Sequence, residues 1–483
     1  MTNPYFIGID IGTQGVRLLA VDAAGVTLGA AEEAFALDDE HRREQDPLIW
    51  WSACTRLMGG LLQELDRSGL SGISVTSTSG TVIPLDEAGT PLHAALMYSD
   101  PRPVEEAAQC REFSEASGEE SFVVFNASCG LPKMCWFMNT HPEKAKHIRY
   151  WAHAADFITG RLTGLYGISD YTNVLKSGYD VANMHWPAWI SRDLFINKDC
   201  LPHVVAPGTV VGMLTDQLSR QFGLQQQVPV AAGMTDGCAS QVASGAVQPG
   251  QWNTTIGTTL VIKGITRQPV KDEKGRLYAH RHPEGYWMPG GAANIGADWV
   301  GSAFAGADLN RLTEAAARLV PTRQYAYPLI QQGERFPFIS PQARGFAPEG
   351  LDAEMLFAAN MEGLAYVERY ALELAAMLSG ETVTAVYSAG GGSKNPVWLQ
   401  IRSNVLNLPV HKMKNVSGAL GAAILAASKT HFRTLTEAAG AMTAIENTTF
   451  PQPGPAAVYE ESYHTFIGLL REKGYLQNNI THA

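Results

Sequence analysis

The first candidate for chemistry is an aspartate that ends an apolar strand and is followed by small polar residues. The stretch GIDIGTQG (8–15) places Asp10 before a turn that contains Gly12, Thr13 and Gln14. Glycines let backbone N–H groups approach a phosphate closely, and a threonine hydroxyl adds a further donor. The aspartate could hold a metal ion beside such a phosphate. A plain tight β-turn fits the same residues, so this stretch alone leaves both interpretations open.

A second carboxylate follows an apolar strand in VPVAAGMTDGCASQVASG (228–245). Asp236 stands where this strand meets a helix of small residues. A general base for a hydroxyl group needs a carboxylate that is fixed at such a strand end. The alternative is that Asp236 caps the helix, a contribution on the order of 1 kcal/mol.

Two further turns are rich in glycine. TIGTT (255–259) repeats the Gly-Thr pattern of the first turn, and AGGGSKNP (389–396) places three glycines before a helix that Asn395 can cap. Three glycines leave room for a flat ligand against the backbone, whereas a plain tight turn is the alternative. The chain contains no G-x-x-x-x-G-K-[ST] motif, so Lys394 is not a P-loop lysine, and no G-x-G-x-x-G follows the first strand.

Hydroxyl and charged groups gather in TSTSGT (76–81) and MYSDPRP (97–103). Such groups bind polyols, because each sugar hydroxyl both donates and accepts hydrogen bonds. The alternative is that Asp100 and Arg102 form an ordinary ion pair on the surface.

Composition limits the function classes. A chain of 483 residues predicts two large domains, and its net charge of −11 argues against a partner that is nucleic acid or an anionic membrane. Any anionic ligand must then be held by backbone N–H groups or a metal ion. Six cysteines without a C-x-x-C pair fit buried free thiols in the cytoplasm, and neither a signal peptide nor an apolar run that could cross a bilayer is apparent.

The elements that must position these groups alternate between strands and helices, which predicts an α/β fold. The two Gly-Thr turns each lie between two apolar strands, and this echo suggests a duplicated fold with a cleft between the copies. The boundary is expected in 243–251, which gives domains 1–245 and 246–483. Predicted strands are 5–10, 16–22, 26–36, 72–77 and 228–236, and 252–264 is predicted to hold two strands joined by the Gly-Thr turn. Predicted helices start at Pro47 after the cap Asp46 and at residue 418 after the cap Ser417. Residues 81–100 are predicted to form a hairpin around 86–89, and 105–165 is predicted to be mainly helical.

The ordered set of motifs resembles the FGGY family of carbohydrate kinases over nearly the whole chain. The resemblance implies an actin/hexokinase-like fold of two ribonuclease-H-like domains, with ATP and a sugar in the cleft between them. It also implies cofactors ATP and Mg²⁺. The motifs that carry it are GIDIGTQGVR (8–17), EQDPLIWW (44–51), VAAGMTDGCASQVASGAV (230–247), TTIGTT (254–259), GERFPFISPQARG (333–345) and SAGGGSKNPVWLQIRSNVLNLPV (388–410).

The resemblance implies roles for individual residues. Asp236 would be the catalytic base on the substrate hydroxyl. Asp10 would hold Mg²⁺ directly or through water, with Asp236 as the second metal-binding carboxylate. The remaining implied contacts are Thr13 and Gln14 near the phosphates, Gly257 and Thr258 at the β- and γ-phosphates, Gly391, Gly392 and Ser393 beside the adenosine, Asn395 near the base, and Thr78, Ser79, Asp100 and Arg102 on the sugar.

The chain departs from the family pattern at two places. Thr78 and Ser79 stand where xylulokinases usually carry Met-His and glycerol kinases Arg-Glu. Together with TNVLKSGYD (172–180), this pattern resembles the branch that acts on D-ribulose. Val416 replaces an acidic residue that often lies near the adenosine.

Several alternatives stay open. D-xylulose, L-ribulose, a four-carbon ketose or a polyol could be the substrate, and a homodimer is one possible assembly. A non-catalytic actin-like or chaperone-like ATPase would share the fold but make little use of the hydroxyls at 76–81. A sugar-binding regulator would lack the base Asp236, and no basic helix-turn-helix is apparent.

Overall fold

The computed structural model describes residues 3–119 and 121–476, which fold into two compact units. The first unit falls within Met1–Val247, His280–Gly285 and Asn415–Thr443. The second falls within Gln248–Ala279, Tyr286–Lys414 and Ala444–Ala483. The predicted domains 1–245 and 246–483 are each continuous, whereas the first unit also takes in two later segments.

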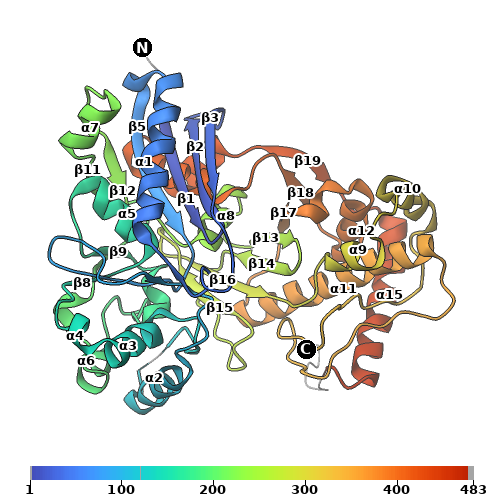
Figure 1. Cartoon of the computed structure of the whole chain (residues 1–483). Coiled ribbons are helices and arrows are strands. Elements are labelled where there is room, and N and C mark those ends of the chain that lie inside the picture. The colour runs from blue at the N-terminus through green and yellow to red at the C-terminus, as the bar shows by residue number, and fades with distance from the viewer. Residues whose placement is uncertain (1–2, 120, 477–483) are drawn as a thin grey trace. The chain divides into compact units, whose positions relative to one another are not determined.

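The first unit is built on a six-stranded sheet with the order β11-β12-β5-β1-β2-β3 (Figure 1). β1 pairs with β2 antiparallel and with β5 parallel, and β12 continues the parallel part beyond β5. The strands are β1 (Tyr5–Gly12), β2 (Gly15–Asp22), β3 (Thr27–Ala34), β5 (Leu70–Ser77), β11 (Val210–Met213) and β12 (Pro229–Ala231).

Helices cover both faces of this sheet. Because side chains of a strand alternate between faces, Ile7 and Ile9 pack with α1 and α5 on one face, and Gly8 points to the other. A Cβ on Gly8 would lie 1.8 Å from the carbonyl oxygen of Ala419, so α13 lies directly against the β1 backbone. The α-helices of the first unit are α1 (Pro47–Glu64), α2 (Val104–Ser117), α3 (Gly130–Thr140), α4 (Pro142–Ala145), α5 (Ala154–Thr163), α6 (Ala188–Asp193), α7 (Asp216–Phe222), α8 (Asp236–Ala243), α13 (Gly418–Thr430) and α14 (Leu435–Met442).

Three short ladders complete the first unit: β4 (Glu44–Gln45) with β7 (Ala95–Leu96), β6 (Ile83–Leu85) with β8 (Tyr150–Ala152), and β9 (Ile168–Asp170) with β10 (His203–Val205). The predicted turn at 86–89 forms, and Asp86 accepts hydrogen bonds from the N–H groups of Ala88 and Thr90. The predicted hairpin is only partly correct. Isolated bridges join Val82 to Leu96 and Leu85 to Pro91, but the ladder partner of β6 is the distant strand β8.

The second unit repeats this topology. Its sheet has the order β15-β16-β14-β13-β17-β18-β19, in which β13 is antiparallel to β14 and parallel to β17, β18 is parallel to β17, and β19 is antiparallel. The strands are β13 (Gln251–Ile256), β14 (Leu260–Gly264), β15 (Tyr278–Arg281), β16 (Trp287–Ala292), β17 (Ala385–Ala389), β18 (Val410–Met413) and β19 (Ile445–Thr449), and the helices are α9 (Asp298–Ala303), α10 (Leu309–Leu319), α11 (Ala353–Ser379), α12 (Pro396–Leu406) and α15 (Pro453–Glu472).

The predicted duplication is therefore confirmed at the level of the sheets. In each unit an antiparallel pair is followed by two parallel strands and one antiparallel edge strand. The two Gly-Thr turns occupy equivalent places, between β1 and β2 and between β13 and β14. Each unit has its own buried apolar core, as a folded domain requires.

Two further expectations concern the cysteines and the absence of a helix that could span a membrane. All six cysteines are buried free thiols, as predicted. Within 3–119 and 121–476, no helix combines the length and the apolar character that crossing a membrane would need.

Candidate active site

Asp10 lies on the face of β1 that α13 covers. It follows Phe6 and Gly8 at a spacing of two residues, and a Cβ built on Gly418 would lie 2.7 Å from its Oδ2 atom. Gly418 is the first residue of α13, which Ser417 caps by accepting a hydrogen bond from the Leu420 N–H. The predicted cap is thus confirmed, and the carboxylate of Asp10 lies at the helix N-terminus, where backbone N–H groups favour negative charge.

Burial and a second negative charge both act on Asp10. Burial is the larger cause and the charge of Asp236 the second, and together they raise the pKa of Asp10 to about 6, while Arg17 opposes them. Two carboxylates that repel each other in a partly buried place suit a divalent cation, because Mg²⁺ prefers oxygen ligands and neutralises both charges.

Asp236 is the first residue of α8, and Thr235 stands at the N-cap position. The alternative that Asp236 serves as the N-cap is therefore wrong. Its Oδ1 atom accepts a hydrogen bond of 2.6 Å from the Gly237 N–H, and the N-terminal turn of the helix favours its charged form. A charged carboxylate held on a short helix can accept a proton from a hydroxyl group.

The first Gly-Thr turn offers backbone donors. Its carbonyl groups are used by the protein, since Thr13 O accepts from Gln45 Nε2 and Gln14 O accepts from the Phe35 N–H. Among the described residues, none accepts a hydrogen bond from the N–H of Thr13 or Gln14. The turn therefore fixes its carbonyls and leaves two donors for an anion.

The second Gly-Thr turn lies between β13 and β14 in the second unit. The Gly257 N–H donates to Thr259 O, and Gly257 O accepts from the Ala297 N–H. The N–H of Thr258 finds no acceptor within the described ranges. A Cβ on Gly257 would meet nothing within 4 Å, so the tip of the turn is open.

The glycine turn after β17 packs against the second Gly-Thr turn. A Cβ on Gly390 would lie 2.5 Å from Ile256 O, and one on Gly392 would lie 2.8 Å from the Ile256 side chain. These two glycines make room for the protein rather than for a ligand, and only Gly391 of the three is exposed. Ser393 is buried and donates its hydroxyl to Gly390 O.

Asn395 caps α12 as predicted. Its side-chain oxygen accepts from the N–H groups of Val397 and Trp398, and its Nδ2 donates to Thr313 Oγ1. The amide therefore has protein partners on both sides, and a contact to an adenine base would have to compete with them.

A buried arginine that sequence reasoning missed joins the two strands that carry these turns. Arg402 is fully buried and forms an ion pair with Glu368 at 2.7 Å. It also donates to Thr254 on β13 and to Ser388 on β17, both at 2.5 Å. This network fixes the strands that lead into the second Gly-Thr turn and the glycine turn. Nothing in the local sequence marks Arg402, because its partners are 14 to 148 residues away.

The predicted sugar-binding residues all lie in the first unit, where Asp100 and Arg102 bond directly to each other. Asp100 is 1% exposed, and its carboxylate accepts from Arg102 Nη2 at 2.7 Å, from Arg102 Nε at 2.9 Å and from the Arg102 backbone N–H at 3.1 Å. The alternative of a simple surface pair is therefore wrong. Arg102 also donates to Glu44 at 2.6 Å, and its guanidinium lies 4.1 Å from the ring centre of Trp136.

Thr78 and Ser79 use their hydroxyls differently. Thr78 Oγ1 lies 2.9 Å from Thr81 Oγ1, which also accepts from the Tyr98 N–H. Ser79 Oγ is buried and has no hydrogen-bond partner among the described residues. An unpaired buried hydroxyl is costly, so a polar ligand atom is a natural partner for it.

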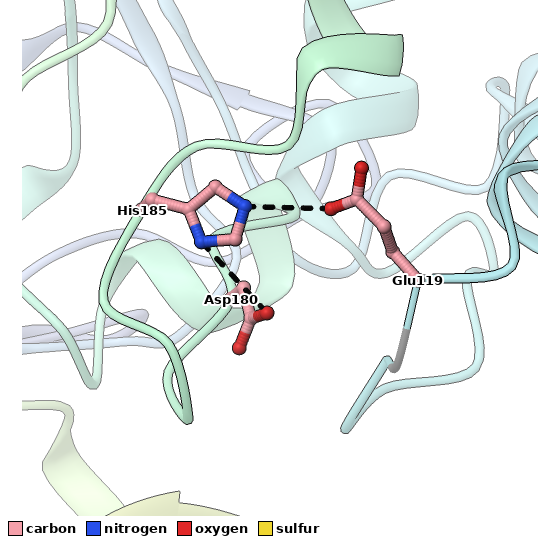
Figure 2. A group of neighbouring side chains, drawn as sticks. All are labelled: Glu119, Asp180 and His185. Carbon is pink, nitrogen blue, oxygen red and sulfur yellow. Dashed lines mark ion pairs between the residues drawn. The ribbon is translucent and has the colours of Figure 1, made fainter.

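Another group with metal-ligand chemistry lies elsewhere in the first unit. Figure 2 shows Glu119, Asp180 and His185 with their side chains directed toward one another. His185 lies 3.4 Å from Glu119 and 3.9 Å from Asp180, distances that ion pairing explains without an ion. The carboxylate of Asp180 is already bonded to the Ala182 N–H and to Asn183.

Comparisons with known proteins agree with this arrangement. A model of the N-terminal domain of the FGGY family of carbohydrate kinases matches residues 5–243, and a model of the C-terminal domain of that family matches residues 252–430. A xylulose kinase from Staphylococcus epidermidis is 26% identical over 99% of both chains, and a gluconokinase from Bacillus licheniformis is 26% identical over 99% of this chain and 97% of that one. The crystal structure of a xylulose kinase from Rhodospirillum rubrum is 25% identical, with a TM-score of 0.85 over 96% of this chain and 98% of that chain.

Proposed function

The chain belongs to the FGGY family of carbohydrate kinases, and we propose that it transfers the terminal phosphoryl group of ATP to the terminal hydroxyl of a small ketose. The sugar-kinase class follows from the family. The proposal concerns the acceptor and the residues that act on it. The observation that carries it is the pair Asp10 and Asp236, two carboxylates near enough for the charge of one to raise the pKa of the other.

The first unit supplies the groups for the acceptor and the metal. Asp10 and Asp236 would hold Mg²⁺, which neutralises charge on the phosphates when it is bound. The N–H groups of Thr13 and Gln14, which have no acceptor among the described residues, would donate to phosphate oxygens. An acidic chain can bind ATP in this way without a P-loop lysine.

Asp236 acts as the base. It accepts a hydrogen bond from the sugar hydroxyl and orients the oxygen toward the γ-phosphorus. As the new P–O bond forms, the bond to the leaving ADP breaks, and the hydroxyl proton passes late to the carboxylate, because an alcohol is too weak an acid to ionise first. Asp236 is the first residue of α8, where the backbone N–H groups of the helix stabilise a negative charge.

The second unit supplies the nucleotide-binding turns. The N–H of Thr258 and the open tip at Gly257 suit the β- and γ-phosphates. Gly391 is the exposed glycine that suits the adenosine, with Gly392 and Ser393 behind it. Asn395 supports this turn as the cap of α12.

D-ribulose is the first candidate substrate. Thr78, Ser79 and the Asp100–Arg102 pair supply polar groups of the kind that bind sugar hydroxyls, and the unpaired Ser79 hydroxyl supports a polar ligand beside it. D-xylulose is the second candidate, because relatives that align over the whole chain are named xylulose kinase.

A substrate panel tests the proposal. ADP release is measured with ATP and Mg²⁺ for D-ribulose, D-xylulose, L-ribulose, gluconate, glycerol and no sugar. The proposal predicts the highest kcat/KM with D-ribulose. Equal ADP release with and without every sugar would instead favour an actin-like or chaperone-like ATPase that phosphorylates no sugar. A preference for gluconate or glycerol would overturn the proposal that the acceptor is a ketose.

A further inference from the structure

The Met234–Thr235 peptide group, which precedes the Thr235–Asp236 bond, is held at both ends by threonine hydroxyls. Thr76 Oγ1 on β5 donates to Met234 O at 2.7 Å. The N–H of Thr235, at the opposite edge of the same peptide group, donates to Thr172 Oγ1 at 2.9 Å. Both bonds are buried, and the backbone of Thr235 also bridges to Ser77 of β5. The orientation of this peptide is therefore fixed from two separate elements.

The polarity of one of these bonds is set by Asp170. The hydroxyl of Thr172 donates its single hydrogen to Asp170 Oδ1 at 2.5 Å, so its oxygen is left to accept from Thr235. Asp170 ends β9 and is itself fixed, because it also accepts from the N–H groups of Thr172 and Asn173 and from Asn173 Nδ2. The result is a directed chain from the Thr235 N–H through Thr172 to Asp170.

Burial of the Asp170 carboxylate lowers the free energy of unfolding. It is 1% exposed, and no cation forms a salt bridge with it within 3–119 or 121–476. Its pKa is raised to about 6, chiefly by burial, while its hydrogen bonds from Thr172 and Asn173 oppose the rise. A buried carboxylate with only neutral partners lowers stability, so a structural role alone explains it poorly.

We propose that Asp170 and Thr172 are positioning residues that hold Asp236 in line with the acceptor hydroxyl, acting through the Met234–Thr235 peptide. The inference rests on the proposed role of Asp236 as the base. Rotation of this peptide would swing the first turn of α8 and move the Asp236 carboxylate. A displacement of about 1 Å in a reacting group can lower the rate about 100-fold without removing a substrate contact.

The test compares Thr172→Val, which keeps shape but removes the hydroxyl, with Thr172→Ser, which keeps the hydroxyl. We expect Thr172→Val to lower kcat about 10- to 100-fold with the KM for ATP and sugar unchanged. Thr172→Ser should stay within about threefold of wild-type kcat. Thr430→Val is the matched control in the first unit, because the Thr430 hydroxyl bonds only to Ala426 O within α13. Its kcat should equal that of wild type.

Failure of this inference is distinct from failure of the proposed function. If Asp236→Asn stays active, both are overturned, since the base is misassigned. If Asp236→Asn is inactive while Thr172→Val keeps wild-type kcat, the inference alone is overturned. A loss in Thr172→Val that appears as a raised KM would overturn it as well, because positioning of the base acts on kcat.

Two measurements decide the matter should Thr172→Val fail to fold. Thr76→Val removes the bond at the carbonyl end of the same peptide and should give the same fall in kcat without a change in KM. Hydrogen exchange on the wild-type full chain should show the amide of Thr235 as protected as the amides of β5. Rapid exchange at Thr235 would overturn the inference whatever the variants do.

Discussion

A Cβ atom on Gly418 would lie 2.7 Å from Oδ2 of Asp10, so the missing side chain at residue 418 makes the room that the carboxylate uses. Gly418→Ala should push Asp10 aside and lower kcat/KM at least about 10-fold. The midpoint of thermal unfolding should not fall together with the activity, because alanine has a higher helix propensity than glycine. Gly440→Ala in α14 is the control, since a Cβ there meets nothing within 4 Å. Wild-type activity of Gly418→Ala would contradict the role of Asp10.

The role of Asp236 predicts a loss of turnover without a loss of nucleotide binding. Asp236→Ala should lower kcat on the order of 10³-fold, because it removes the base. ATP binding measured by calorimetry without sugar should persist. Near-normal turnover would remove Asp236 from the chemistry.

The glycine turn allows a comparison of neighbouring positions. A Cβ on Gly390 meets Ile256 O at 2.5 Å and the residue has φ +82°, so Gly390→Ala should destabilise the second unit and lower the thermal midpoint. Gly391 is exposed, and its Cβ would come no nearer than 4.0 Å to the protein. Gly391→Ala should leave the midpoint unchanged but raise the KM for ATP. An unchanged KM for ATP would mean that Gly391 does not face the nucleotide.

The Asp100–Arg102 pair predicts separate effects on stability and on sugar binding. Asp100→Ala removes the buried partner of Arg102, which keeps its bond to Glu44, and should lower the free energy of unfolding by about 2 kcal/mol. Arg102→Lys keeps the charge but loses the two-pronged bond, and should raise the KM for the sugar more than the KM for ATP. Equal changes in both KM values would argue for a purely structural pair.

The buried side chain of Lys133 should make the stability of the protein depend on pH. It is fully buried, its Nζ donates to Ala127 O and Cys129 O, and burial lowers its pKa to about 7. The unfolded chain holds this proton up to about pH 10, so between pH 7 and that value wild-type stability gains about 1.4 kcal/mol per pH unit from Lys133. Below pH 7 the penalty for burying the charge is complete.

The free energy of unfolding of Lys133→Met should therefore exceed that of wild type by the largest amount at pH 6. This difference should shrink by about 2 kcal/mol or more between pH 7 and pH 9. Urea unfolding at each pH measures it, with exposed Lys198→Met as the control. A difference between Lys133→Met and wild type that does not vary with pH would show that the buried amine carries no titration of its own.

Features that depend on neighbouring residues could be predicted from the sequence. The caps Asp46, Asn395 and Ser417 all form, because a cap bonds within the first turn of its own helix. The two Gly-Thr turns were also recognisable, since each lies between two strands of adjacent sequence. The duplicated topology followed from them.

Features that depend on distant contacts could not be predicted. Thr76 and Met234 are 158 residues apart, and Thr172 and Thr235 are 63 apart, so no local pattern marks their bonds. Two of the three glycines in 390–392 proved to face Ile256, a contact that the sequence does not reveal. The same holds for Arg402, which reads as an ordinary polar position of a helix.

The segment Asn415–Thr443 has a consequence for the order in which the protein is made. Its helix α13 covers one face of the first sheet and touches the β1 backbone at Gly8, yet it is synthesised about 400 residues after that strand. During translation this face of the N-terminal sheet therefore stays uncovered until nearly the whole chain has left the ribosome. A fragment that stops at residue 247 would lack this helix and should aggregate rather than fold, whereas adding the missing segment as a separate peptide should rescue it.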